Sequence, residues 1–350
     1  MTSTPDEVSY CTREQVQETL GQADSVRNNR VIDRAILAAS RDLEGELHRR
    51  FYPTLATRYP PVRWVSGDTL YLNHIDYELL GITSLTVDGV TLVEGTDFYL
   101  HPEVLPHTSI RLYRDANAAW PSDPRDIVIV GPAGGSNGAE PAGALAAAIS
   151  TTTATQMTVS DSSAVGVGDL VLVGAERVIV TEKELITSGE TVTGTVAASN
   201  AGTTIPVSDG SAFHYGETIL VGAERMFVEQ VAGNNLVVKR AVNASTLAAH
   251  VNTDVVYVPR LCTIRRGVAG TTAAVHADAA VLERNRPPGL VNETAVAASI
   301  VYAEQGKAGW PGSRTTGSGD NARPAAGGSI EQVWARAYMA YGRKGRIGVC

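Results

Sequence analysis

Two stretches of the chain are copies of one another, and this repeat constrains the fold more than any other feature of the sequence. Met157–Glu182 reads MTVSDSSAVGVGDLVLVGAERVIVTE, and Ile205–Gln230, 48 residues further on, reads IPVSDGSAFHYGETILVGAERMFVEQ. Half of the aligned positions are identical, including the block Leu-Val-Gly-Ala-Glu-Arg. Chance does not produce such a match, so the two stretches are copies of one module. In each copy two apolar runs flank a Gly-Ala turn, which predicts a β-hairpin.

A second similarity follows a different spacing. Lys239–His250 reads KRAVNASTLAAH, and Arg265–His276 reads RRGVAGTTAAVH, an offset of 26 residues. The two offsets agree if the second module is inserted into a hairpin loop of the first. The first module then consists of 157–182 and 259–284, and the second, nested module occupies 183–258. Insertion costs little at an exposed loop whose strand ends lie close together. Three tandem modules, two of them degenerate, are the alternative, and we favour nesting.

Both ends of the chain carry helical signals. An apolar stripe at steps of three and four residues predicts a long helix from about residue 29 to Phe51, which Pro53 closes. A short helix precedes it within 1–53, opened by a capping box of Thr12 and Gln15. A returning helix lies in 285–305, and a last helix follows Ser329 in 329–350. The predicted core of the resulting bundle consists of Ile32, Ile36, Ala39, Leu43, Leu47 and Phe51.

Between the helices and the modules we expect a small antiparallel β domain at 54–135. It contains short strand-like runs, and the Asp88-Gly89 step between two of them is a strong hairpin signal. Residues 136–156 are rich in Gly, Ala and Pro and are predicted to be a linker, and 306–328, with seven glycines, a flexible one. The expected fold class is therefore α+β: a helical bundle with a small antiparallel β domain and inserted, nested β-hairpin modules.

Composition and motifs argue against several classes of function. The net charge of −8 gives no global basic balance for nucleic-acid binding, and three distant cysteines give no disulfide framework. The N-terminal residues lack the pattern of a secretory signal, and no apolar run reaches the ~20 residues of a membrane span. The sequence contains no G-x-S-x-G, H-E-x-x-H or Walker motif. We therefore expect no enzymatic activity, no cofactor and no metal.

Charged and histidine residues repeat with the modules. His250 and His276 occupy equivalent places, which would suit a repeated metal ligand. Because no further ligand recurs with them at a suitable spacing, we expect a histidine that closes a turn by hydrogen bonding. The repeated Glu176-Arg177 and Glu224-Arg225 pairs are interpreted as a charged hairpin edge rather than as buried ion pairs.

Three features together carry a resemblance to a known family. They are the N-terminal helical pair ending in HRRFYP (48–53), strand patterns such as LLGITSLTVDGVTL (79–92) and IVIVGPAG (127–134), and the returning helix followed by a Gly/Ser-rich stretch and a final amphipathic helix. In these the chain resembles the head-to-tail adaptor (connector) proteins of long-tailed, siphovirus-like bacteriophages, especially those of actinobacterial hosts. RRGVAGTTAAVH (265–276) also resembles a β motif common in structural proteins of such phages. The resemblance covers about 8–135 and 285–350, and the inserted modules depart from it.

The resemblance implies a structural role in the virion neck, in a protein made in the host cytoplasm. It implies a homo-oligomeric ring, usually a dodecamer, that docks under the portal protein, extends the DNA channel and offers a platform for stopper and tail proteins. Double-stranded DNA would pass without sequence recognition, and an acidic channel wall would repel its phosphates. The modules would contact tail or capsid proteins. The expected interface with the portal or a neighbouring subunit consists of Ile330, Val333, Trp334, Ala337, Tyr338, Tyr341, Arg343, Lys344 and Arg346.

Two alternatives stay open. The last helix either docks on another protein, as its Trp and Tyr residues suggest, or packs on the 29–51 helix of its own chain. The repeated β modules would also suit an adhesion or glycan-binding protein of a virion surface.

Overall fold

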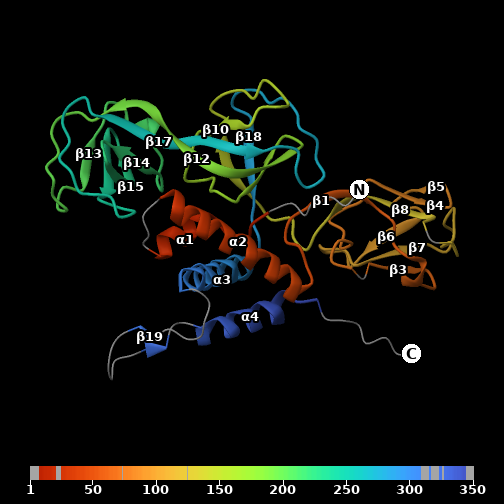
Figure 1. The fold of residues 1–350 in the computed structure, drawn as a ribbon. Helices are drawn as coiled ribbons and strands as arrows, with labels where there is room; N and C mark the ends of the chain where they lie inside the picture. Colours follow the sequence, from red (N-terminus) through yellow and green to blue (C-terminus); the bar gives the residue numbers. More distant parts are fainter. Residues whose placement is uncertain are drawn as a thin grey trace.

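The computed structural model describes residues 8–20, 25–72, 74–123, 125–308, 315–316, 323–324 and 327–343 (Figure 1). β-Structure dominates this part of the chain, with one sheet of ten strands and two of four, whereas helices make up 21%. The expected fold class, a helical bundle with a small β domain, is therefore wrong. One physical reason is that residues assigned to a linker form a strand, because pairing with a distant strand outweighs their poor local β-propensity.

Four helices form a layer along one side of the molecule. They are α1 (Arg13–Leu20), α2 (Val26–Leu47), α3 (Gly289–Ala308) and α4 (Gly327–Tyr341). The expected capping box starts α1: the Thr12 N–H donates to Gln15 Oε1 at 3.0 Å, and the Gln15 N–H donates to Thr12 Oγ1 at 3.3 Å. Helix α2 ends at His48, whose φ of 51° is left-handed. Helix α3 packs along α2, and α4 packs on both.

The helices bury one continuous hydrophobic cluster. All six predicted core residues are buried, at 3% exposure or less: Ile32, Ile36, Ala39, Leu43, Leu47 and Phe51. Tyr10, from the extended segment before α1, packs edge-to-face on Phe51 with ring centroids 5.8 Å apart. Among the described residues, no helix combines the length and apolar character that crossing a membrane requires.

The β domain consists of two four-stranded antiparallel sheets packed around a shared core. One sheet has the order β1 (Thr54–Arg58), β8 (Ile127–Ala133), β4 (Ser84–Val87), β5 (Val90–Leu92), and the other β2 (Val65–Ser66), β3 (Thr69–Tyr71), β7 (Ser109–Leu112), β6 (Phe98–His101). Asp88 and Gly89 join β4 to β5 with φ values of 49° and 76°, which is the turn that the sequence predicts.

The ten-stranded sheet holds the two modules. Its order is β13 (Thr204–Pro206), β16 (Asn235–Lys239), β15 (Glu224–Ala232), β14 (Thr218–Val221), β17 (Val255–Arg265), β12 (Glu176–Thr191), β11 (Leu170–Val173), β18 (Val281–Asn285), β9 (Ala139–Ala144), with β10 (Gln156–Thr158) paired to β17. Farther along the chain, β19 (Thr315–Thr316) pairs with β20 (Arg323–Pro324). The expected linker at 306–328 otherwise lies mostly outside the described residues.

Strand pairing repeats at the offsets seen in the sequence. Leu170 pairs with Ile179 as Thr218 pairs with Phe227, and Ile179 pairs with Arg265 as Phe227 pairs with Lys239. One hydrophobic cluster draws on residues between 142 and 180 and between 262 and 282, and a separate one draws on residues between 192 and 258. We call these units the first and the second module. The long strands β12 and β17 run through both of them.

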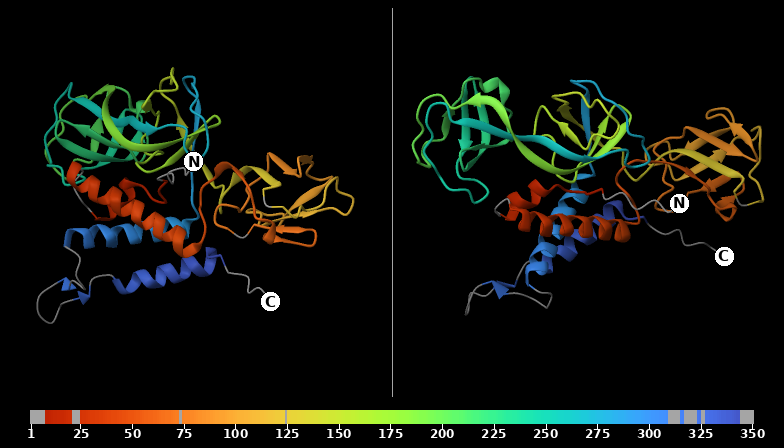
Figure 2. Two further views of the ribbon diagram at one scale, coloured as in Figure 1. Left: turned by 45° about the vertical axis from the view of Figure 1, so that its right-hand side comes forward. Right: turned by 45° about the horizontal axis from the view of Figure 1, so that its top comes forward.

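The units lie in a row. The second module and the β domain are at opposite ends, the first module is between them, and the helices run along one side (Figure 2). The first module contacts the helices directly: its Leu170, Ile179 and Val268 belong to the helical cluster.

Candidate functional site

The first module buries one glutamate in a dense polar cluster. Glu176 begins β12 and is 1% exposed. Its two carboxylate oxygens accept hydrogen bonds from Nε and Nη2 of Arg266, both at 2.7 Å. The main-chain N–H groups of Gly267 and Ala274 donate to them at 3.0 Å each, and His276 Nε2 lies 2.8 Å from Oε2. The carboxylate therefore closes the loop that runs from 266 to 276.

The second module contains the same cluster. Glu224 accepts hydrogen bonds from Nε and Nη2 of Arg240 at 2.6 and 2.7 Å, and from the N–H groups of Ala241 and Ala248 at 3.0 and 2.9 Å. His250 Nε2 lies 2.9 Å from its Oε2. Every partner stands 26 residues before its equivalent in the first module. The duplicated feature is thus a Glu-Arg-His cluster that closes the loop from 240 to 250.

These carboxylates are held ionised. Burial alone would raise their pKa, but the hydrogen bonds from arginine, main-chain N–H and histidine lower the pKa of Glu176 and of Glu224 to about 2. A carboxylate with so low a pKa and with both oxygens engaged is a poor general base and has little capacity left for a ligand. The clusters therefore stabilise the loops rather than perform chemistry.

Both glutamates lie in a different environment from the one that the sequence predicts. They were expected at a charged hairpin edge beside Arg177 and Arg225, but they are buried, and their partners are the distant Arg266 and Arg240. The histidines do help to close their loops by hydrogen bonding, as predicted, and the buried glutamate is the partner of each. The signal that would have found the clusters is present in the repeat, because glutamate, arginine and histidine all recur at module spacing.

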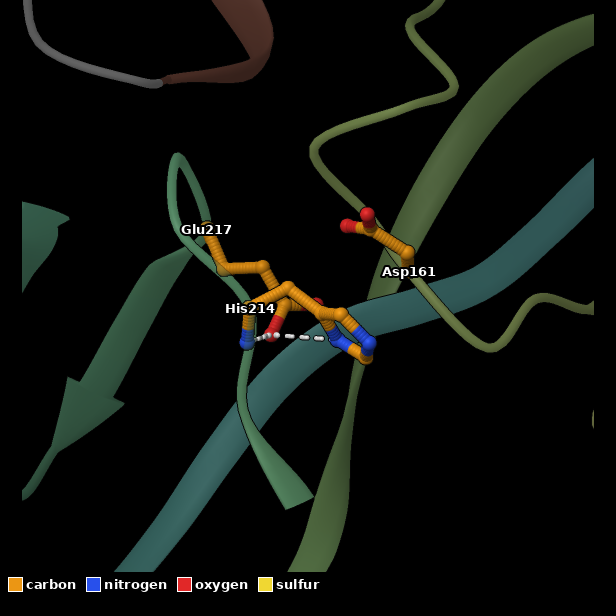
Figure 3. A group of neighbouring side chains, drawn as sticks. All are labelled: Asp161, His214 and Glu217. Carbon is orange, nitrogen blue, oxygen red and sulfur yellow. Dashed lines mark hydrogen bonds and ion pairs between the residues drawn. The ribbon is translucent and has the colours of Figure 1, made fainter. Parts of the chain in front are cut away.

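A third buried carboxylate lies between the modules, in the group Asp161, His214 and Glu217 (Figure 3). Potential ligand atoms of these three residues lie within 4.8 Å of one another. Glu217, however, accepts hydrogen bonds at 2.8 and 2.7 Å from the guanidinium of Arg260 and two more from Ser162. A cation would have to displace that guanidinium, so the group does not fit a metal site.

Helix α4 carries six of the nine predicted interface residues, and most of its apolar stripe faces its own chain. Ala337 is fully buried, and Trp334 and Tyr341 pack against the helical cluster. Ile330 and Val333 are half-buried, whereas Tyr338 is 42% exposed. Lys344 and Arg346, the other predicted interface cations, lie outside the described residues.

Arg343 fastens the end of α4 to the rest of the molecule. Its N–H donates to the Leu47 carbonyl at the end of α2 at 3.0 Å, and its guanidinium donates to the Leu72 carbonyl in the β domain. Its Nε lies 3.8 Å from Oε1 of Glu78, which Arg49 also contacts at 3.1 Å. Burial raises the pKa of Glu78 despite these two cations. One residue of the predicted interface thus joins α2, α4 and the β domain.

A cleft of about 900 Å³ lies between the two modules on one side and α1, with the segment before it, on the other. Gln17 and Glu18 are on the helical side, and Phe227, Lys239 and Asn243 are on the module side. Its lining is polar and carries charges of both signs, unlike the mostly apolar pockets that bind small molecules.

The chain matches no family model, no curated protein and no solved structure.

Proposed function

We propose that this chain is a structural head-to-tail adaptor of a tailed bacteriophage. In this role it is one subunit of a ring beneath the portal protein, extends the DNA channel and joins the capsid to the stopper and tail. The proposal starts from the sequence resemblance of 8–135 and 285–350 to that family. It describes a protein that works by association rather than by reaction.

The observation that carries the proposal is that α4 is docked on its own chain by one face and exposes the other. One face of this helix is docked on α2 and α3, and Arg343 fastens its end. The opposite face exposes Tyr338 and Met339, at 42% and 78%. Tyrosine is enriched at binding hot spots, and methionine adapts to varied partner surfaces. A helix that is anchored on one side and presents Tyr and Met on the other fits a platform for a portal or a neighbouring subunit.

The arrangement of units supports the same role. The helices lie along one side of the row, so they can meet neighbouring subunits while the modules and the β domain reach other proteins of the neck (Figure 2). The net charge of −8 suits a channel through which DNA slides without sticking.

The test is the mass of the assembly, measured by light scattering on the protein alone and mixed with the portal protein of the same virion. We expect the intact chain and a Gln332→Glu variant to form a large ring with the portal. A Tyr338→Glu variant should fail to do so, because it places a charge in the apolar contact. Gln332 is exposed on the same helix, so its variant controls for an added charge.

A different result would favour the alternative function, adhesion at a virion surface. If the intact chain stays monomeric and indifferent to the portal, the adaptor proposal fails. Binding of the full chain to host cell-surface material, lost on changes in the modules, would then support a virion-surface adhesion protein.

A further inference from the structure

The connection between the β domain and the first module is short and closely packed at both ends. Residues 134–138 join β8 to β9. A Cβ at Gly134 would lie 2.3 Å from the Tyr52 carbonyl oxygen. A Cβ at Gly138 would lie 2.4 Å from the carbonyl oxygen of Arg286. Because any larger residue would collide with this backbone, both ends of the connection require glycine.

Asn137 lies exposed at the end of this connection. Within the described part of the chain its side-chain amide has no hydrogen-bond partner, so the amide is free to turn toward the main chain. Among the same residues, the N–H of Gly138 donates only to the Ser136 hydroxyl, at 3.2 Å, and takes no part in the sheet. The amide carbon of Asn137 is thus next to a main-chain nitrogen that no Cβ shields.

This arrangement suits ring closure between the side chain and the main chain. The Gly138 nitrogen loses its proton and bonds to Cγ of Asn137, while the bond from Cγ to the amide nitrogen breaks and ammonia leaves. Water then opens the resulting succinimide. Attack at Cγ gives a normal aspartate, whereas attack at the main-chain carbonyl carbon gives isoaspartate, in which the main chain runs through the side-chain methylene. The net reaction consumes water, releases ammonia and needs no oxidant or cofactor.

The chain contains a matched comparison at another site. Asn200 is exposed, its amide has no partner among the described residues, and the Ala201 N–H donates to the Ser199 hydroxyl at 3.2 Å. The local arrangement is therefore that of Asn137, except that the following residue is alanine instead of glycine. The Cβ of alanine restricts the main chain and hinders the approach of its nitrogen to Cγ. Asn200 should accordingly react more slowly than Asn137.

We propose that Asn137 is a site of spontaneous modification, at which the folded protein converts asparagine to isoaspartate and aspartate through a succinimide formed with Gly138. The reaction needs only water, so it stands independently of the proposed adaptor role. Isoaspartate adds a carbon to the main chain of a connection whose two ends are held by close packing. The added length shifts Ala139 relative to Asn285, its partner at the start of β9. We therefore expect isoaspartate to loosen the pairing of β9 with β18.

Peptide mass spectrometry on the full-length protein tests the reaction. The protein would be incubated at physiological temperature and mildly alkaline pH, sampled over time and digested after lysine and arginine. Asn137 and Asn200 are then the single asparagines of two different peptides. We expect the amide of Asn137 to become an acid about tenfold faster than that of Asn200, or more, and a methyltransferase specific for isoaspartate to label the Asn137 peptide. Equal rates at the two sites, or no reaction at Asn137, would overturn the proposal.

A gain of reaction at the second site gives a test that does not depend on the packing at Gly138. Ala201 is exposed, so Ala201→Gly should leave the fold intact. We expect this variant to convert Asn200 about tenfold faster than the unaltered chain does, or more, because it removes the shielding Cβ. Ala201→Val is the matched control and should not speed the reaction. An unchanged rate at Asn200 in Ala201→Gly would contradict the assigned arrangement.

Hydrogen exchange measures the structural consequence. Protein that carries isoaspartate would be separated from fresh protein by ion exchange, and the deuterium uptake of the two would be compared. We expect faster uptake over 139–144 in the modified protein, because its strand pairing starts out of register. Freshly prepared Asn137→Asp carries the new charge on a normal main chain, so it should keep the protection of the intact protein. Equal uptake in modified and fresh protein would show that the added carbon does not loosen β9.

Discussion

At the scale of single residues, Glu224 is expected to contribute strongly to stability. Its replacement by Gln keeps the shape but removes the charge that faces Arg240, which is itself buried. Breaking a buried ion pair on one side costs about 3–5 kcal/mol. We expect Glu224→Gln to lower the free energy of unfolding by that amount in urea denaturation. Glu229→Gln, on the exposed part of the same strand, is the control and should change it by less than about 0.5 kcal/mol.

The carboxylates of Glu176 and Glu224 also predict that the stability of the protein depends on pH. The pKa of Glu176 and of Glu224 falls from 4.5 to about 2 on folding. A lowered carboxylate pKa contributes stability that is fully present above the unfolded value and is lost as the pH falls through the folded value. We therefore expect the free energy of unfolding to drop between about pH 4.5 and pH 2. Glu224→Gln should show a shallower drop than the intact chain, and an equally steep drop would argue against the assigned ion pair.

The pKa of Asp169 predicts a pH dependence of the free energy of unfolding that is opposite in sign to that of Glu176 and Glu224. Loss of hydration raises its pKa to about 6, against the effect of the Gly166 N–H, which donates to it at 2.8 Å. A raised carboxylate pKa favours folding at low pH, and this contribution is lost as the pH rises from about 3.8 to 6. Asp169→Asn should thus gain stability relative to the intact chain between pH 4 and pH 7, on the order of 2 kcal/mol. A difference that does not vary with pH in thermal unfolding would contradict it.

At the scale of elements, the loop from 266 to 276 differs from its equivalent in the second module, because it contacts the β domain. Gly270 has a φ of 78°, and a Cβ there would lie 1.7 Å from the Leu55 carbonyl of β1. Its equivalent in the second module is Ala244, which adopts a φ of 55°. Gly270→Ala should therefore disrupt the contact with β1 and cost about 2 kcal/mol or more.

Gly222→Ala is the matched control for this change. Gly222 also has a positive φ, 58°, but a Cβ there would meet nothing within 4 Å. It should cost only about 1 kcal/mol of backbone strain. Equal losses for the two variants in chemical denaturation would show that the close approach of Leu55 does not matter.

Elements fixed by local chemistry were predictable from the sequence, whereas elements fixed by distant partners were not. Thr12 and Gln15 cap a helix, and Asp88-Gly89 makes a hairpin turn, through contacts within a few residues. Residues 139–144, by contrast, contain Gly, Pro and three Ala and were assigned to a linker, yet they pair with 281–285 across the chain. The same limit applied to Glu176, whose arginine partner is 90 residues away.

At the scale of the whole molecule, the two modules share their backbone. Residues 179–184 of β12 pair with 261–265 of β17 in the first module, while 186–191 pair with 255–258 toward the second. Sheet hydrogen bonds therefore cross from one hydrophobic cluster to the other without an intervening linker. The β domain instead has its own two sheets and its own core.

This continuity predicts that the modules unfold together. Ile219→Ala removes a fully buried side chain from the second module and should cost about 2–5 kcal/mol. We expect hydrogen exchange to show lower protection in the first module as well, over 170–180, because its strands continue into the damaged unit. Ile127→Ala, equally buried in the β domain, is the control and should leave the modules protected. If the loss of protection in Ile219→Ala stopped at the second module, the long strands would not couple the two, and each module would be a separate folding unit.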